Sequence, residues 1–325
     1  MSILSKIRNR LLLSLALGAL VFLGLSLYAN IQELMAALRS FRWGFFPWIL
    51  SLALGNYLLR FLKWDYYLGG LSISISKEDS LAIFFSGLTM SVTPGKLGEV
   101  LKSFLLKARQ GTPISLSAPI VVAERLTDFL AVIALASLGV YAFGYGARTL
   151  AITLALVLLV VLILGCRPVC LRLLRPLEAL PFLGGFPNRL EVAYESIAEL
   201  VRLRRLLAAT AISVLAWFAE CLGFYMVFLG FGFPSSWLQA TFIYAFSTLV
   251  GALTMLPGGL GATEGSMTGL LLRLPVPRQQ AVAATLLIRL ATLWFAVLVG
   301  AGVLIFYQRR LLTKEGFLAT KDNSI

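Results

Sequence analysis

The chain has 325 residues, of which 59% are hydrophobic and only 13% are charged, and its formal net charge is +13. Soluble domains carry about 25% charged residues, so this composition excludes a water-soluble globular protein and indicates a polytopic protein of the lipid bilayer. The positive charge does not indicate a nucleic-acid partner, because the arginines lie between apolar runs of membrane-spanning length, where they set topology.

The first apolar run follows basic residues near the N-terminus, as the apolar part of a signal peptide does. The run Leu11–Ala29 is too long for that role and no clear cleavage site follows it, so we expect a retained span. Six runs of about 18–29 residues are predicted to be full spans. In chain order they are Leu11–Ala29, Phe45–Leu62, Ser115–Tyr141, Ala147–Gly165, Ala208–Phe231 and Gln279–Tyr307.

Two further apolar regions are interrupted. Ser80–Lys107 is broken at Pro94-Gly95, and Trp237–Arg273 is broken at Pro257-Gly258-Gly259. Proline and glycine both interrupt helices. The pieces of the first region are too short to cross a bilayer, whereas the first piece of the second could just cross. Each region is therefore either a full crossing or a re-entrant hairpin.

The distribution of arginines decides between these alternatives. The segment Cys166–Arg205 holds seven arginines and the N-terminus is also basic, so both are predicted to be cytoplasmic. These two segments lie on the same side of the membrane only if Ser80–Lys107 is a hairpin, because a full crossing would put them on opposite sides. Counting the crossings further along the chain, the second hairpin enters from outside and the C-terminus lies in the cytoplasm. We thus predict an all-α, multi-pass protein of the cell (inner) membrane, with six spans and two re-entrant hairpins.

The predicted cytoplasmic loop, residues 166–206, contains one amphipathic segment. Asn188–Arg205 has the spacing of a helix with one apolar face, formed by Leu190, Tyr194, Ile197 and Val201. Such a helix either lies on anionic headgroups or is a solvated connector.

The two broken regions resemble each other. Both contain Pro-Gly-x-Leu-Gly followed by a carboxylate, and Arg125 follows Pro94 at nearly the spacing at which Arg289 follows Pro257. This suggests one membrane domain, 1–325, with repeated halves 11–141 and 147–307. Three crossings in each half make the repeat inverted, as in many secondary transporters. The alternative is chance similarity between glycine-rich motifs.

Several charged residues fall inside the apolar regions. Such a residue costs about 2.5–3.5 kcal/mol at the centre of a span, so it needs a partner or a watery cavity. The candidates are Lys96, Glu99 and Lys102 in the first hairpin, Glu124, Arg125 and Asp128 in Ser115–Tyr141, Glu220, Glu264 in the second hairpin, and Arg289 in the last span.

Two interpretations of these charges stay open. In the structural one, Arg125 pairs with Asp128, three residues along the helix, and Arg289 pairs with Glu264 or Glu220. In the functional one, Lys96, Arg125 and Arg289 converge with the hairpin tips and bind an anion such as a lipid phosphate, while the carboxylates hold a cationic moiety. The predicted substrate site comprises Pro94, Gly95, Lys96, Gly98, Glu99, Lys102, Glu124, Arg125, Asp128, Pro257, Gly258, Gly259, Gly261, Glu264 and Arg289.

Residues suited to metal or nucleophilic chemistry are few. Three cysteines and no histidine form neither a disulfide framework nor a zinc site. No nucleophile–base pair or phosphate-binding loop is recognisable. We therefore expect no metal, no cofactor and no enzymatic activity.

Four motifs carry a resemblance to a known family. They are Ser-x-Thr-Pro-Gly-Lys-Leu-Gly-Glu-Val-Leu-Lys (Ser91–Lys102), Ala-Glu-Arg-Leu-Thr-Asp-Phe-Leu (Ala123–Leu130), Leu-Pro-Gly-Gly-Leu-Gly-Ala-Thr-Glu-Gly (Leu256–Gly265) and Arg289. They resemble the lysylphosphatidylglycerol synthase transmembrane family, also called flippase-like or UPF0104. The family is similar to the membrane half of the multiple peptide resistance factor, to which movement of aminoacylated phosphatidylglycerol between leaflets is attributed.

The resemblance implies a lipid function without naming the lipid. The aminoacyltransferase domain of the resistance factor has no counterpart in this chain, so lipid synthesis is not expected. We expect a flippase or transporter of an anionic-headgroup lipid, of phospholipid or polyprenyl-phosphate type. The alternatives are a membrane-embedded enzyme or accessory subunit of glycolipid assembly, and a scaffold. A homo-oligomer and a partner lipid-modifying enzyme both stay open.

Overall fold

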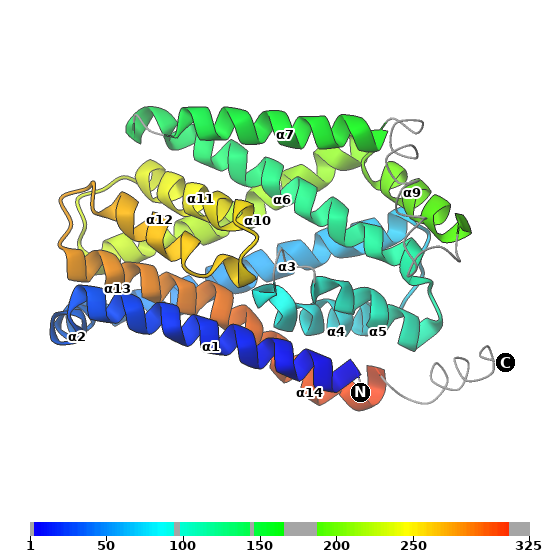
Figure 1. Cartoon of the computed structure of the whole chain (residues 1–325), viewed down its shortest axis with the longest axis horizontal. Helices are drawn as coiled ribbons and strands as arrows, with labels where there is room; N and C mark the ends of the chain where they lie inside the picture. The colour runs from blue at the N-terminus through cyan, green and yellow to red at the C-terminus, as the bar shows by residue number, and fades with distance from the viewer. Residues whose placement is uncertain (1–2, 94–97, 144–145, 166–186, 312–325) are drawn as a thin grey trace.

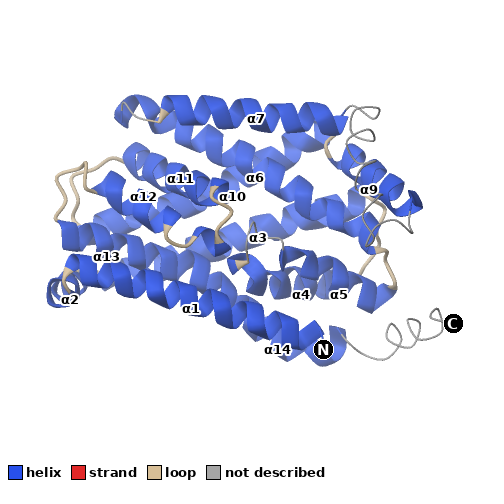
Figure 2. Cartoon of the chain, viewed as in Figure 1, coloured by secondary structure: helices blue, strands red, loops and turns tan. Residues whose placement is uncertain are grey.

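The computed structural model describes residues 3–93, 98–143, 146–165 and 187–311. Within these ranges all regular structure is helical, with no strand (Figure 2). The longest helices run lengthwise beside one another, and most connections lie at the two ends of the bundle (Figure 1). The expected all-α class is confirmed for the described part of the chain.

Long helices occupy the positions of the six predicted spans. They are α1 (Ile3–Ala29), α3 (Phe46–Gly70), α6 (Ile114–Phe143), α7 (Ala147–Gly165), α10 (Leu203–Phe231) and a final stretch made of α13 (Arg278–Arg289), the π-helical η5 (Leu290–Trp294) and α14 (Phe295–Leu311).

Within the described residues, four stretches are long and apolar enough to cross a membrane: Trp43–Gly70, Ala147–Leu164, Leu203–Phe231 and Arg278–Tyr307. A fifth candidate is a pair bent by 92°, formed by Ala16–Ala29 and α2 (Ile31–Ser40). α6 is 30 residues long and carries Glu124, Arg125 and Asp128 within its first half. A multi-pass membrane protein is thus supported, and the number of six crossings stays a prediction.

The two interrupted regions form helical hairpins in space. The first consists of α4 (Lys77–Leu88), η2 (Thr89–Val92) and α5 (Leu101–Gln110); the second consists of α11 (Trp237–Leu253), η4 (Pro257–Gly259) and α12 (Ala262–Leu271). In Figure 1, α4 and α5 lie toward the end of the bundle that holds α9 and the N-terminus, while α11 and α12 lie toward the opposite end, near α2.

The tips of the two hairpins meet inside the bundle. Val92 of the first and Leu260 of the second share a buried apolar cluster with Leu293 and Val297. Gly258 has a φ of 61°, and a Cβ there would lie 3.3 Å from the Val92 Cα atom. Glycine adopts this backbone conformation without strain and lets the tips approach closely. The predicted break at Pro257-Gly258-Gly259 is confirmed, whereas Pro94 and Gly95 lie outside the described residues.

The predicted amphipathic segment is helical over α9 (Pro187–Leu200). Its residues Tyr194 and Ile197 are buried in the same apolar cluster as core residues of α6 such as Ile133. The apolar face therefore packs against protein, which fits a connector better than a helix that lies on headgroups. Residues 166–186 of the predicted cytoplasmic loop lie outside the described part of the chain.

Candidate functional site

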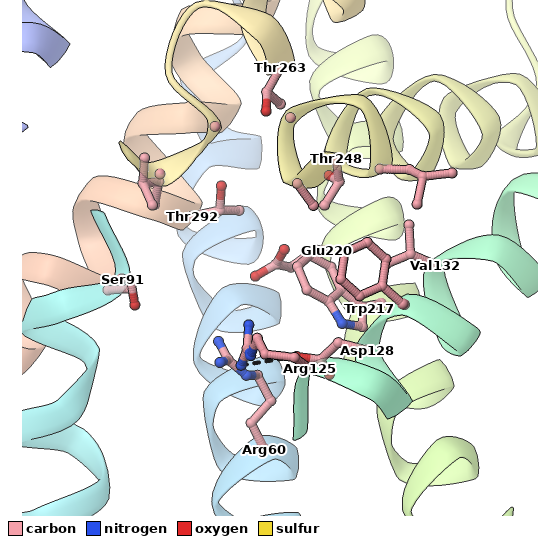
Figure 3. A pocket seen from close by; sticks show the side chains of 18 of the residues that line it. Arg60, Ser91, Arg125, Asp128, Val132, Trp217, Glu220, Thr248, Thr263 and Thr292 are labelled. Atoms are coloured by element: carbon pink, nitrogen blue, oxygen red, sulfur yellow. Dashed lines mark ion pairs between the residues drawn. The ribbon is translucent and has the colours of Figure 1, made fainter. Parts of the chain in front are cut away.

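A cavity of about 340 Å³ lies where the hairpin tips meet α3, α6, α10 and the last helical stretch. One part of its wall is charged or hydroxylated, and includes Tyr57, Arg60, Arg125, Asp128, Glu220, Tyr244, Thr248 and Arg289. Another part is apolar, and includes Val121, Val122, Phe129, Val132, Leu249, Met255 and Leu256. Figure 3 shows Arg60 and Arg125 side by side in this cavity, with Glu220 above them in that view.

The cavity reaches the surface through its apolar wall. Val122 on α6, and Met255 and Leu256 just before η4, line it and are 49%, 57% and 42% exposed. Val122 lies in the first half of a 30-residue helix and the other two lie at the tip of the second hairpin. The opening is therefore on the side of the bundle, between apolar side chains, and not at its ends.

Ion pairs join the first hairpin to α3 and α6. The carboxylate of Glu99 lies 3.4 Å from Arg60, 3.1 Å from Arg125 and 3.8 Å from Lys102. Lys102 in turn lies 2.5 Å from Glu124 and its ammonium is 4.6 Å from the centre of the Trp64 ring. These side chains are buried except for that of Arg125, which is 19% exposed. Burial makes each unpaired charge costly, so the pairing holds hairpin and helices together.

A second group of contacts holds α3, α6 and α10 together. The ammonium of Lys63 donates to Asp128 at 2.6 Å, to Ser213 at 2.6 Å and to Thr127 at 3.2 Å. Asp128 also pairs with Arg125 at 3.1 Å, the spacing that the sequence suggested. Arg125 is thus shared between Asp128 on its own helix and Glu99 on the first hairpin.

The second hairpin is secured by Arg289. Its Nε donates to Glu264 at 2.5 Å, and its guanidinium also donates to the carbonyl of Gly258 at 2.7 Å. The other oxygen of Glu264 accepts from the backbone N–H of Gly261 at 2.7 Å, at the start of α12. Arg289 therefore pairs with Glu264, one of the two partners that the sequence left open, and holds the tip of the hairpin to α13.

The structure divides the predicted site residues into three groups. Arg125, Asp128, Gly258, Gly259 and Arg289 line the cavity. Behind the cavity wall lie the ion-pair partners Glu99, Lys102, Glu124 and Glu264. At the hairpin tips, the backbone N–H of Gly98 donates to the Thr93 hydroxyl at 2.8 Å, and Pro257 and Gly261 belong to the turns of the second tip. Pro94, Gly95 and Lys96 lie outside the described residues.

The predicted site carboxylates pair with cations of the chain itself. Each of Glu99, Glu124, Asp128 and Glu264 has such a partner. That they hold a cationic moiety of a ligand stays a prediction. Because a desolvated carboxylate needs a nearby positive charge, the buried arginines and lysines take up these carboxylates first.

Sequence reasoning missed two buried cations, Arg60 and Lys63. Both stand near the end of the apolar run Phe45–Leu62, where basic residues are normally topology signals. They are 6% and 1% exposed. Their spacing from Asn56, another buried polar residue, follows the period of a helix and places all three on one face of α3. That periodicity is the signal by which they could have been found.

Comparisons with known proteins agree with the motifs. The family model of the lysylphosphatidylglycerol synthase TM region matches residues 11–300. The UPF0104 membrane protein PH1989 of Pyrococcus horikoshii is 28% identical over 286 residues, which cover 79% of this chain and 85% of that protein. The UPF0104 membrane protein MJ1078 of Methanocaldococcus jannaschii is 27% identical over 238 residues, which cover 68% of this chain and 95% of that protein. The chain therefore belongs to the family of the lysylphosphatidylglycerol synthase transmembrane region, and the relatives that it matches are UPF0104 membrane proteins.

Proposed function

We propose that this protein binds a lipid with a phosphate-containing anionic headgroup in the cavity and moves it between the two leaflets. The observation that carries the proposal is a cavity with arginines in its wall and an apolar opening on the side of the bundle. Guanidinium groups bind phosphate through paired hydrogen bonds, and an apolar opening lets the lipid tails stay among other tails. A cavity of about 340 Å³ has the size of a small-ligand site and suits a headgroup.

Unpartnered polar atoms at the cavity support a polar ligand. Among the described residues, the Nε of Arg125 and the hydroxyl of Ser91 have no hydrogen-bond partner, and both residues line the cavity. A buried polar group without a partner costs about 1–3 kcal/mol, and a bound phosphate group would supply acceptors for both. A scaffold protein has no need for such a cavity, and its polar core would be closed.

The fold also supports the predicted topology. The N-terminal end of α1, the C-terminal end of α14 and α9 lie at one end of the bundle, whereas α2 lies at the other (Figure 1). Because the two hairpins extend inward from opposite ends, the inverted repeat and the re-entrant hairpins fit the same arrangement. In this proposal both termini and the arginine-rich segment face the cytoplasm.

Cysteine labelling in intact cells tests the topology. In a background where Cys166, Cys170 and Cys221 are replaced by alanine, Arg39→Cys on α2 is expected to react with a membrane-impermeant maleimide. Arg189→Cys is expected to react only after the cells are permeabilised. Labelling of Arg189→Cys from outside would rule out this topology.

Lipid movement in reconstituted vesicles tests the function. The wild-type protein is expected to bring fluorescent phosphatidylglycerol from the inner leaflet to a membrane-impermeant quencher. Arg125→Lys keeps the charge but loses the planar pair of donors, so we expect about a tenfold slower movement. Arg109→Lys is the matched control. Arg109 pairs with Asp79 outside the cavity, so this substitution is expected to leave the rate of lipid movement unchanged. Movement at the wild-type rate in Arg125→Lys, in vesicles with equal protein content, would show that this cavity is not the transport site.

A further inference from the structure

The cavity contains two arginines that share a single carboxylate. Arg60 of α3 approaches one oxygen of Glu99, at 3.4 Å, and Arg125 of α6 approaches the other, at 3.1 Å. Two guanidinium groups so close repel each other unless an anion lies between them. In this structure the Glu99 carboxylate is that anion, and it comes from the first hairpin.

Among the described residues, the charges at or next to the cavity are equal in number. The cations are Arg60, Lys63, Lys102, Arg125 and Arg289, and the anions are Glu99, Glu124, Asp128, Glu220 and Glu264. An additional phosphate group would bring a net negative charge into this neutral set, at a high cost in a poorly solvated site. If the phosphate takes the place of one carboxylate on its arginines, the net charge stays the same, but the phosphate gains guanidinium donors that are otherwise occupied.

Of the carboxylates that pair with an arginine, Glu99 is the one best placed to be replaced. Asp128 is also bonded to Lys63 at 2.6 Å, and Glu264 is bonded to both Arg289 and the Gly261 backbone. Glu99 lies 3.4 Å and 3.1 Å from its arginines, farther than Asp128 from Lys63 or Glu264 from Arg289, and has a third cation, Lys102, at 3.8 Å, toward which it can turn. Arg60 is also little engaged: within the described ranges its one hydrogen bond is the 3.4 Å contact with Glu99.

We propose that Arg60 and Arg125 together bind the phosphate, and that the Glu99 carboxylate holds the position which the phosphate takes. This inference rests on the proposed function and adds to it a second phosphate ligand, Arg60, and a competing internal anion. Binding then breaks the ion pairs of Glu99 with Arg60 of α3 and Arg125 of α6, while Lys102 of the same hairpin keeps its pair with Glu124. Occupancy of the cavity is thereby coupled to the position of that hairpin, while Arg289 continues to hold the second one.

Ligand affinity of the purified full-length protein in detergent tests the proposal. The probes are dioctanoyl phosphatidic acid, dioctanoylglycerol as the matched lipid without phosphate, and inorganic phosphate. Arg60→Lys is expected to weaken binding of phosphatidic acid about tenfold, as Arg125→Lys does, because the planar donors are lost. Glu99→Gln is expected to strengthen it about tenfold, because the competing charge is removed. Arg109→Lys is expected to bind like the wild type.

Tighter binding of phosphatidic acid by Glu99→Gln is the decisive result, since a merely structural role of Glu99 predicts weaker binding. If Glu99→Gln does not fold, the affinity of Arg60→Lys tests the proposal instead, because that variant keeps the ion pair with Glu99. If Arg60→Lys binds like the wild type while Arg125→Lys is weakened, the pair is wrong and the proposed function stands. If the wild type binds phosphatidic acid no better than dioctanoylglycerol, the proposed function itself fails. If inorganic phosphate binds as tightly as phosphatidic acid, the arginines serve a soluble anion and the lipid function is overturned.

Discussion

Replacement of Arg289 by alanine is expected to lower the free energy of unfolding by about 3–5 kcal/mol, because it leaves a buried carboxylate without its cation. Glu264 is 0% exposed, and Arg289 is the cation that pairs with it among the described residues. The substitution also removes the donor to the Gly258 carbonyl, which holds the tip of the second hairpin. Thermal unfolding of the protein in detergent, followed by tryptophan fluorescence, measures the effect.

Two further variants distinguish the effect of an unpaired Glu264 carboxylate from the effect of removing any arginine. Arg278→Ala removes an exposed arginine of the same helix, which lies 5.4 Å from the centre of the Tyr28 ring, and is expected to cost about 1 kcal/mol or less. The double variant Arg289→Met with Glu264→Gln removes both charges and is expected to recover most of the stability. An equal loss in the double variant and in Arg289→Ala would contradict the uncompensated charge as the cause.

Gly300→Ala is expected to destabilise the protein by about 1–3 kcal/mol, because α14 packs there directly against the backbone of the first hairpin. An added Cβ would lie 2.4 Å from the backbone nitrogen of Thr89 and 2.9 Å from the Phe85 carbonyl oxygen. Backbone atoms cannot turn aside as a flexible side chain can, so α14 and the hairpin must separate. The measurement is again the unfolding transition in detergent.

The chain offers a control two residues further along the same helix. Gly302 is exposed, and an added Cβ would meet no atom within 4 Å among the described residues. Gly302→Ala is therefore expected to leave stability unchanged or to raise it slightly, since alanine favours helix more than glycine does. If both alanine variants behave alike, the close packing at Gly300 does not contribute to stability.

Local sequence determined much of the architecture. Long apolar runs predicted the positions of α1, α3, α6, α7 and α10, because a bilayer requires long stretches of apolar helix whose backbone groups bond internally. The glycines after Pro257 predicted the break between α11 and α12, because proline and glycine stop a helix wherever they occur. The pair of Arg125 with Asp128 was predictable for the same reason, since helical spacing alone brings them together.

The tertiary structure alone decided which charges meet across helices. Arg60 and Lys63 stand where basic residues commonly signal topology, yet α3 packs against α6 and α10 so closely that Lys63 reaches Asp128 and Ser213. Likewise the carboxylates pair with the chain's own cations, and Glu99 joins arginines of two different helices. An ion pair depends on a separation of a few ångströms between side chains on different segments. That separation is set by helix packing, which the pattern within a single segment does not contain.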